Sequence, residues 1–177
     1  MPQHGTACDC RDLPADVDRL WVAGPYDGWL RHAVHSFKFG GETARAPSLA
    51  ALLASECASI GPDVVLVPVP MHVKRKRQRG YDQVAILAHA LGKQTRQPVV
   101  AALAKDRETR TQVGLSAAER SMNLIDAFVV RPGIVLPDAV VLIDDVATTG
   151  STLSECARTL RRSGVRSISA LAIAHGL

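Results

Sequence analysis

The most informative segment of this chain reads Val140-Val-Leu-Ile-Asp-Asp-Val-Ala-Thr-Thr-Gly-Ser-Thr152. Its first four residues are large and apolar, which is typical of a strand buried on both faces of a parallel sheet. Two adjacent carboxylates, Asp144 and Asp145, follow this strand. A turn of small and hydroxyl-bearing residues, 147–152, then opens the next helix. Ligands of open α/β sheets bind beyond the carboxyl ends of the strands, so this turn is the first place to expect a site.

Strands alternate with helices along the rest of the sequence. Short apolar or β-branched runs indicate strands, and apolar residues spaced by three and four indicate helices. The expected strands are residues 63–69, 99–103, 125–130, 139–143 and 166–174. The expected helices are residues 29–39, 47–59, 81–95, 116–123 and 151–163. This order predicts an α/β fold with a mostly parallel, twisted sheet flanked by helices, preceded by a loose leader over residues 1–19.

Length and composition narrow the class of protein further. The chain has 177 residues, of which 47% are hydrophobic and 21% charged, as expected for one globular domain with its own core. No apolar run reaches the roughly 18–20 residues that span a membrane, and no secretory signal is visible, so we expect a soluble cytoplasmic protein. The four cysteines are too few for a disulfide scaffold. The net charge of +4 suits phosphate-bearing ligands or nucleic acid.

The residues after the strand have the chemistry of a phosphate and sugar site. Backbone N–H groups at the start of a helix, together with hydroxyls, form a cradle for phosphate. Paired carboxylates beside such a cradle hold sugar hydroxyls, a magnesium ion, or both. The segment lacks the Gly-Lys-Ser/Thr ending of a Walker loop and the Gly-x-Gly-x-x-Gly pattern of a dinucleotide site. The alternative is a threonine-rich helix cap that happens to follow two aspartates.

The segment resembles the phosphoribosyl-pyrophosphate (PRPP) motif of type I phosphoribosyltransferases. Further stretches are similar to the ComF branch of that family, the competence-associated phosphoribosyltransferase-like proteins. They are His35-Ser-Phe-Lys-Phe-Gly40, Val67-Pro-Val-Pro70, Arg79-Gly-Tyr-Asp-Gln83, Arg110-Thr-Gln112 and residues 120–123. The resemblance implies a type I phosphoribosyltransferase-like fold with a small N-terminal hood. Residues 1–39 would form the leader and hood, and residues 40–177 the phosphoribosyltransferase-like domain.

The resemblance also implies roles for individual residues. Asp144 and Asp145 would bind the ribose hydroxyls and the magnesium ion that accompanies PRPP. The cradle for the 5′-phosphate would consist of Ala147, Thr148, Thr149, Gly150, Ser151 and Thr152. The pyrophosphate would meet the loop after the strand at 63–69, through Met71, His72, Arg75 and Arg79. In this interpretation Arg79 and Gly80 begin the next helix, and Lys38 is either a ligand contact or an exposed partner of the helix dipole.

Two polar stretches can be interpreted either as parts of the ligand site or as ordinary surface segments. Residues 74–79 carry five basic side chains, which form either the pyrophosphate contact or a solvated or nucleic-acid-binding surface. Residues 105–112 contain no aliphatic side chain, so we expect them to be exposed and mobile. They are either a plain surface loop or, as the resemblance implies, a loop that closes over PRPP. Closure would bring in the catalytic cations Lys105, Arg107 and Arg110 and exclude water.

The implied reaction is displacement at C1 of PRPP by an unknown nitrogenous acceptor with release of pyrophosphate, the work of a glycosyltransferase of the phosphoribosyltransferase kind. Whether the protein is an enzyme stays open at this point. The alternative is a non-catalytic protein of DNA uptake that binds PRPP or single-stranded DNA, with other competence proteins as partners. A third reading is a PRPP-sensing regulator with a protein partner. The sequence does not specify the acceptor, and a homodimer is one of the expected states because dimers are frequent in this fold.

The cysteines argue against a structural metal. Full-length relatives of this kind usually carry an N-terminal zinc segment with two Cys-x-x-Cys pairs, whereas this chain has only Cys8-Asp-Cys10 at the matching place. One residue between the sulfurs and no second pair cannot close a tetrahedral site within one chain, so we expect no zinc. The alternative is a site completed by His4 and a second protomer. Cys57 and Cys156 are expected to be small core residues.

Overall fold

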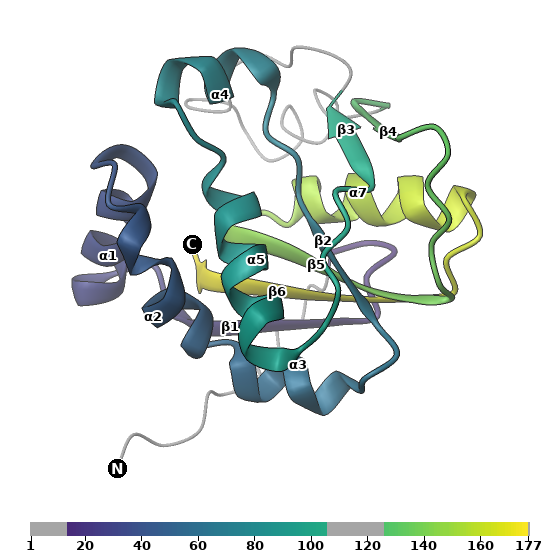
Figure 1. The fold of residues 1–177 in the computed structure, drawn as a ribbon, viewed down its shortest axis with the longest axis horizontal. Coiled ribbons are helices and arrows are strands. Elements are labelled where there is room, and N and C mark those ends of the chain that lie inside the picture. The colour runs from purple at the N-terminus through teal and green to yellow at the C-terminus, as the bar shows by residue number, and fades with distance from the viewer. Residues whose placement is uncertain (1–13, 106–125, 177) are drawn as a thin grey trace.

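A parallel sheet of four strands forms the centre of the structure, a computed structural model that describes residues 14–105 and 126–176 (Figure 1). In spatial order the strands are β1 (Arg19–Pro25), β6 (Ser167–His175), β5 (Ala139–Ala147) and β2 (Val65–Pro68). Every neighbouring pair among them is parallel. Most residues of β5 and β6 are buried, which requires packing on both faces of the sheet. The predicted α/β class is confirmed, and the sheet is consistent with a phosphoribosyltransferase-like fold.

Three amphipathic helices pack against this sheet. They are α1 (Gly28–Phe39), α5 (Gln83–Thr95) and α7 (Ser151–Arg162). Helix α5 contacts β2 and β5, α7 contacts β5, and α1 contacts β6. Apolar residues at the helical period fix the buried face of each helix, as Leu30, Val34 and Phe37 do in α1. The three helices that the sequence predicted at these places are confirmed.

Strand β1 was not predicted from the sequence. It pairs with β6 from Arg19 opposite Ser169 to Pro25 opposite His175, so the segment that follows the expected leader belongs to the sheet. Only alternate residues, Leu20 and Val22, are buried in this edge strand, so one of its faces is covered more fully than the other. The boundary drawn at residue 39 between hood and main domain stays a prediction.

The single helix expected over residues 47–59 is broken in two. A short 3-10 helix, Thr43–Arg45, leads into α2 (Ala46–Ala51), and α3 (Ala54–Ile60) follows. The amides of Leu52 and Leu53 bond to carbonyls three residues earlier rather than four, which tightens the chain at the break. Leu53 and Cys57 are thereby both buried, so the break serves the packing of the core.

The basic stretch is a helix, α4 (Val73–Arg79), where the sequence had suggested a loop over residues 71–75. The His72 side chain caps its first turn by accepting a hydrogen bond from the amide of Lys74. Gly80 ends it with a φ of +81°, a conformation that suits glycine. The expectation that Arg79 and Gly80 begin the next helix is therefore wrong, because Asp82 caps α5 by accepting from the amide of Ala85.

A small antiparallel ribbon lies beside the main sheet (Figure 1). It consists of β3 (Leu103–Lys105) and β4 (Phe128–Val130), the latter within the strand expected at 125–130. The strand expected at 99–103 is reduced to one bridge between Val99 and Leu66, and β3 begins only at its last residue. The helix expected at 116–123, and all of the predicted loop except Lys105, lie outside the described residues.

Both cysteines of the described core behave as expected. Cys57 and Cys156 are free and fully buried, and burial raises the pKa of Cys57 to about 11. Cys8 and Cys10, on which the zinc expectation rests, lie outside the described residues. Within residues 14–105 and 126–176, no helix has the length and apolar character needed to cross a membrane.

Candidate functional site

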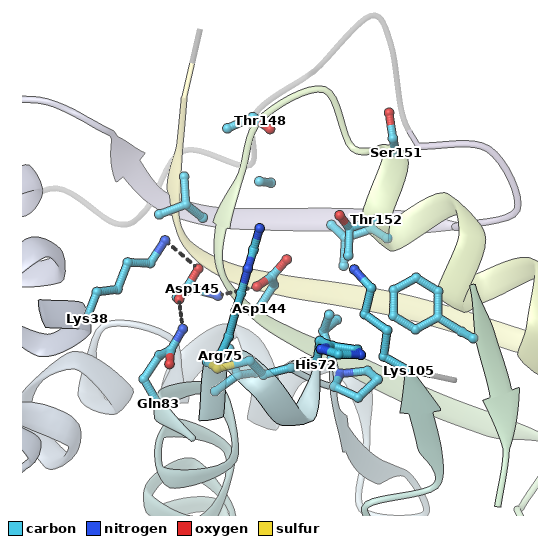
Figure 2. A pocket seen from close by; sticks show the side chains of 18 of the residues that line it. Lys38, His72, Arg75, Gln83, Lys105, Asp144, Asp145, Thr148, Ser151 and Thr152 are labelled. Atoms are coloured by element: carbon cyan, nitrogen blue, oxygen red, sulfur yellow. Dashed lines mark hydrogen bonds and ion pairs between the residues drawn. The ribbon is translucent and has the colours of Figure 1, made fainter. Parts of the chain in front are cut away.

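A cavity of about 490 Å³ opens at the carboxyl ends of β2 and β5 (Figure 2). The end of β5 and the start of α7 form one wall, and α4 with the start of α5 forms another. Tyr26 and Lys38 come from the N-terminal segment, and Lys105 and Phe128 come from the small ribbon. Segments that are far apart in the sequence thus converge at the place where an open α/β sheet binds its ligand.

Most of the residues predicted from the sequence lie around this one cavity. Those that line it are Met71, His72, Arg75, Arg79, Lys105, Asp144, Asp145, Ala147, Thr148, Gly150, Ser151 and Thr152. Thr149 instead lines a neighbouring cavity of about 230 Å³, together with Pro14, Leu20 and His175. Arg107 and Arg110 lie outside the described residues.

The turn between β5 and α7 brings hydroxyl groups to the start of a helix. Gly150 adopts a φ of +70° and is the last residue of the turn, immediately before α7 begins at Ser151. The hydroxyls of Thr149 and Ser151 are 2.8 Å apart, and the Ser151 amide bonds to Thr149 Oγ1 at 3.4 Å. The positive end of the helix dipole and the first amides of α7 therefore lie beside hydroxyl groups at the rim of the cavity.

The two acids lie within β5, because the strand is four residues longer than the sequence indicated. Pairing with β6 continues past the acids, through Asp144 opposite Ala172 to Ala147 opposite His175. Successive side chains of a strand point to opposite faces, so the two carboxylates diverge, as Figure 2 shows. The amide of Asp145 donates a hydrogen bond of 2.8 Å to Oδ1 of Asp144.

Asp145 is held by two side chains from other elements. Lys38 Nζ lies 2.8 Å from its Oδ1, and Gln83 Nε2 donates to its Oδ2 at 3.0 Å (Figure 2). Asp145 is only 5% exposed and Gln83 only 4%. Lys38 is thus paired with a buried carboxylate, and the alternative of an exposed partner of the helix dipole is wrong.

The environment of Asp144 disfavours its charge. Burial, and then the neighbouring carboxylate of Asp145, raise the pKa of Asp144 to about 7, while Lys38 acts in the opposite direction. A carboxyl group that titrates near neutral pH beside a cluster of cations is typical of functional sites.

Cations surround these acids. Arg75 and Arg79 reach the cavity from α4, and the guanidinium of Arg79 lies 4.5 Å above the ring of Phe39. Lys105 reaches it from β3 and lies over the ring of Phe128, 5.3 Å from its centre. Burial, and then the charge of Arg75, lower the pKa of Lys105 to about 8. A dense positive field of this kind favours an anionic ligand.

The donor set fits a magnesium ion that arrives with its ligand. Within the described ranges no group of three or more His, Cys, Asp and Glu side chains could enclose a metal. Magnesium, however, is commonly held by one or two carboxylates together with substrate phosphates and water. Asp144, which lines the cavity and keeps lone pairs beyond its bond to the Asp145 amide, supplies such a carboxylate.

Sequence reasoning did not assign Gln83, Tyr26 or Phe128 to the site. Gln83 belongs to a stretch that carried the resemblance, Arg79-Gly-Tyr-Asp-Gln83, and its position in the first turn of α5 places it beside β5. Tyr26 follows the unpredicted β1, so no local signal pointed to it. Phe128 reaches the cavity only because β4 pairs with β3.

The parallel sheet flanked by helices defines an α/β protein whose architecture is consistent with a phosphoribosyltransferase-like fold. The curated relatives narrow this class. Competence protein F of Haemophilus influenzae is 33% identical over 169 residues, which cover 90% of this chain and 74% of that protein. The chain therefore belongs to the competence protein F (ComF) family.

Two further relatives agree with this assignment. DNA utilization protein YhgH of Escherichia coli K12 is 32% identical over 170 residues, covering 90% of this chain and 73% of the relative. Competence protein ComFC of Bacillus subtilis is 26% identical over 145 residues, covering 78% and 56%. No family model matches the chain.

Proposed function

We propose that the cavity binds PRPP together with magnesium and that the protein transfers the phosphoribosyl group to a nitrogenous acceptor with release of pyrophosphate. One observation carries the proposal: a single cavity joins the acids of β5, the hydroxyl turn at the start of α7 and the cations of α4 and β3. These three features match the three parts of PRPP, which are a ribose diol, a 5′-phosphate and a pyrophosphate.

The chain's own residues account for binding and orientation. The turn 147–152 and the first amides of α7 hold the 5′-phosphate. Asp144 accepts hydrogen bonds from the ribose hydroxyls, which fixes the sugar between the turn and the cations. Arg75, Arg79 and Lys105 line the same cavity. In this proposal their charges stabilise the departing pyrophosphate as the bond from C1 to oxygen breaks.

The acceptor nitrogen would approach C1 from the side opposite the departing pyrophosphate and form the new bond there. Magnesium, when bound, neutralises the phosphate oxygens and thereby makes pyrophosphate a better leaving group. The protein contributes mainly position and electrostatics, so its residues act before and during bond cleavage rather than through a covalent step.

Calorimetric titration with PRPP and magnesium at physiological salt tests the proposal. A saturable signal, followed by pyrophosphate release when nitrogenous acceptors are screened, is the expected result. The absence of binding heat, together with no competition by ribose 5-phosphate, would contradict it. Asp144→Asn is the matched variant, because it keeps the size of the side chain and removes its charge.

A second function, binding of single-stranded DNA without turnover, is supported by the surface of α4. Lys74, Arg75, Lys76 and Arg77 are all exposed along this one helix. A cluster of cations binds phosphate backbones with a steep dependence on salt. The names of the relatives, which refer to competence and DNA utilization, agree with such a role. DNA binding that falls steeply with salt and survives Asp144→Asn would favour this function.

A further inference from the structure

The contacts of Asp145 join three separate elements. Lys38 lies in the last turn of α1, Gln83 in the first turn of α5, and Asp145 near the end of β5. The Lys38 side chain is 18% exposed and that of Asp145 only 7%, so their ion pair is largely removed from water. We call these three residues the Asp145 clamp.

Further contacts dock the end of α1 in the same place. The hydroxyl of Tyr81 donates to the carbonyl of Phe37 at 2.8 Å and accepts from the amide of Gly41 at 3.3 Å. Arg79, which lines the cavity, lies over the ring of Phe39, the last residue of α1. The Asp145 clamp is therefore the buried part of the contact between α1 and the connection from α4 to α5.

Gln83 shows that the clamp has a fixed orientation. A carboxylate only accepts hydrogen bonds, so the amide nitrogen of Gln83 must face Asp145 and its oxygen must point away. That oxygen is buried and has no hydrogen-bond partner among the described residues. An unsatisfied buried acceptor destabilises a fold, and a functional role is one of the reasons for which such a group is retained.

From these contacts we infer that Asp145 is a positioning residue, whose carboxylate holds Lys38 and Gln83 so that α1 and α5 frame the cavity, while Asp144 is the acid that meets the ligand. The inference rests on the proposed function for the identity of that ligand. It divides the two adjacent acids, to which the sequence had given one shared role in binding ribose and magnesium.

The physical basis is the cost of breaking a buried pair. Removing one partner leaves the other charge buried without compensation, whereas removing both leaves no lone charge. Lys38→Met and Asp145→Asn should therefore each disturb the cavity, and the double variant should restore it. An acid that contacts the ligand directly would not be rescued by a change at Lys38.

The experiment compares the wild-type chain with K38M, D145N, the double variant K38M/D145N, and D144N. Each is titrated with PRPP and magnesium, and its urea midpoint is measured. We expect each single clamp variant to raise the Kd about tenfold or more and the double variant to recover most of that loss. D144N should raise the Kd about a hundredfold or more, with or without K38M.

Three results would overturn the inference. If the double variant binds PRPP as weakly as D145N, then Asp145 itself contacts the ligand. If the clamp variants lower the urea midpoint and leave the Kd unchanged, the clamp is merely structural. If the urea midpoints of the single variants simply add in the double variant, the residues are not coupled. Failure of the wild-type chain to bind PRPP contradicts the proposed function instead, and the midpoints still decide whether the clamp exists.

Discussion

Asp144 and Asp145 are consecutive in β5, yet the amide of Asp145 bonds to the Asp144 carboxylate at 2.8 Å while its own carboxylate turns away to Lys38. The strand geometry forces this divergence, because neighbouring side chains emerge on opposite faces. Both acids line the cavity, but Asp145 is in addition tied to Lys38 of α1 and to Gln83 of α5. Substitutions at the two positions therefore test different parts of the site.

The cations of α4 are not equivalent. Arg75 and Arg77 are both exposed, but only Arg75 lines the cavity. We expect Arg75→Ala to weaken pyrophosphate binding about tenfold at physiological salt, because Arg75 reaches the cavity and can make a charge-assisted contact with a pyrophosphate bound there. Arg77→Ala, which removes the same charge from the same helix, should change the affinity less than about twofold. Equal losses in calorimetric titrations of the two variants would point to a diffuse surface effect.

Two separate constraints favour glycine at position 150. Its φ is +70°, and a Cβ atom there would lie 2.7 Å from Cγ of Pro14. Gly164 also has a positive φ, of +96°, but a Cβ at that position would meet nothing within 4 Å. Gly150→Ala should therefore be less stable than Gly164→Ala by about 1 kcal/mol or more, since overpacking adds to the backbone strain.

Urea unfolding measures that difference. Because the turn must shift to relieve the contact with Pro14, Gly150→Ala should also weaken binding of ribose 5-phosphate, and Gly164→Ala should not. Retention of full ribose 5-phosphate affinity in Gly150→Ala would show that the turn does not hold the phosphate.

The raised pKa of Asp144, about 7, predicts opposite effects of pH on stability and on binding. The folded state holds this proton more tightly than the unfolded state, whose pKa is near the ordinary value of 3.8. The contribution of Asp144 to stability therefore falls as the pH rises from about 4 to about 7. Binding of PRPP with magnesium should rise over the upper part of that range, as the carboxylate becomes charged.

Both trends are measured as differences between the wild-type chain and Asp144→Asn, which cancels the titration of PRPP itself. Unfolding in urea at several pH values gives the first trend, and calorimetry gives the second. A difference in stability that stays flat between pH 4 and 7 would show that Asp144 is ionised throughout.

The lowered pKa of Lys105 predicts that PRPP binds more weakly at alkaline pH. The pKa of this side chain is lowered to about 8, so its positive charge disappears as the pH rises through that value. The affinity for PRPP should decline between about pH 7 and pH 9, and Lys105→Met should abolish the decline while lowering the affinity at pH 7. Lys93→Met is the control, because Lys93 is exposed on α5 and does not line the cavity. An unchanged alkaline decline in Lys105→Met would assign it to another group.

Local patterns were sufficient to predict the centre of the fold. The apolar run that ends at Ile143 and the hydroxyl turn up to Thr152 carry their own signals, so β5, the turn and α7 follow from the sequence. The amphipathic period of α1 likewise identified that helix and its end at Gly40. These elements position both acids and the cradle, and so the location of the site was also predictable.

The remaining features depend on contacts between distant parts of the chain. Strand β1 is buried only at alternate positions and owes its form to pairing with β6. Helix α4 has no buried residue, and its ends are set by the His72 cap and by Gly80 rather than by an apolar face. The clamp joins α1, α5 and β5, and no spacing within one segment encodes that meeting.

The order of the strands has a consequence for the synthesis of the protein. Strand β1 pairs only with β6 within the described sheet, and β2 pairs with β5, so the strands made first have partners that leave the ribosome last. A nascent chain that ends before Ala139 lacks both strands with which β1 and β2 pair in the sheet, so backbone N–H and C=O groups of β1 and β2 are left unpaired. Non-local parallel pairing of this kind folds slowly and invites aggregation. The nascent protein should therefore depend on chaperones until its final segment is free, and expression at low temperature should raise its yield.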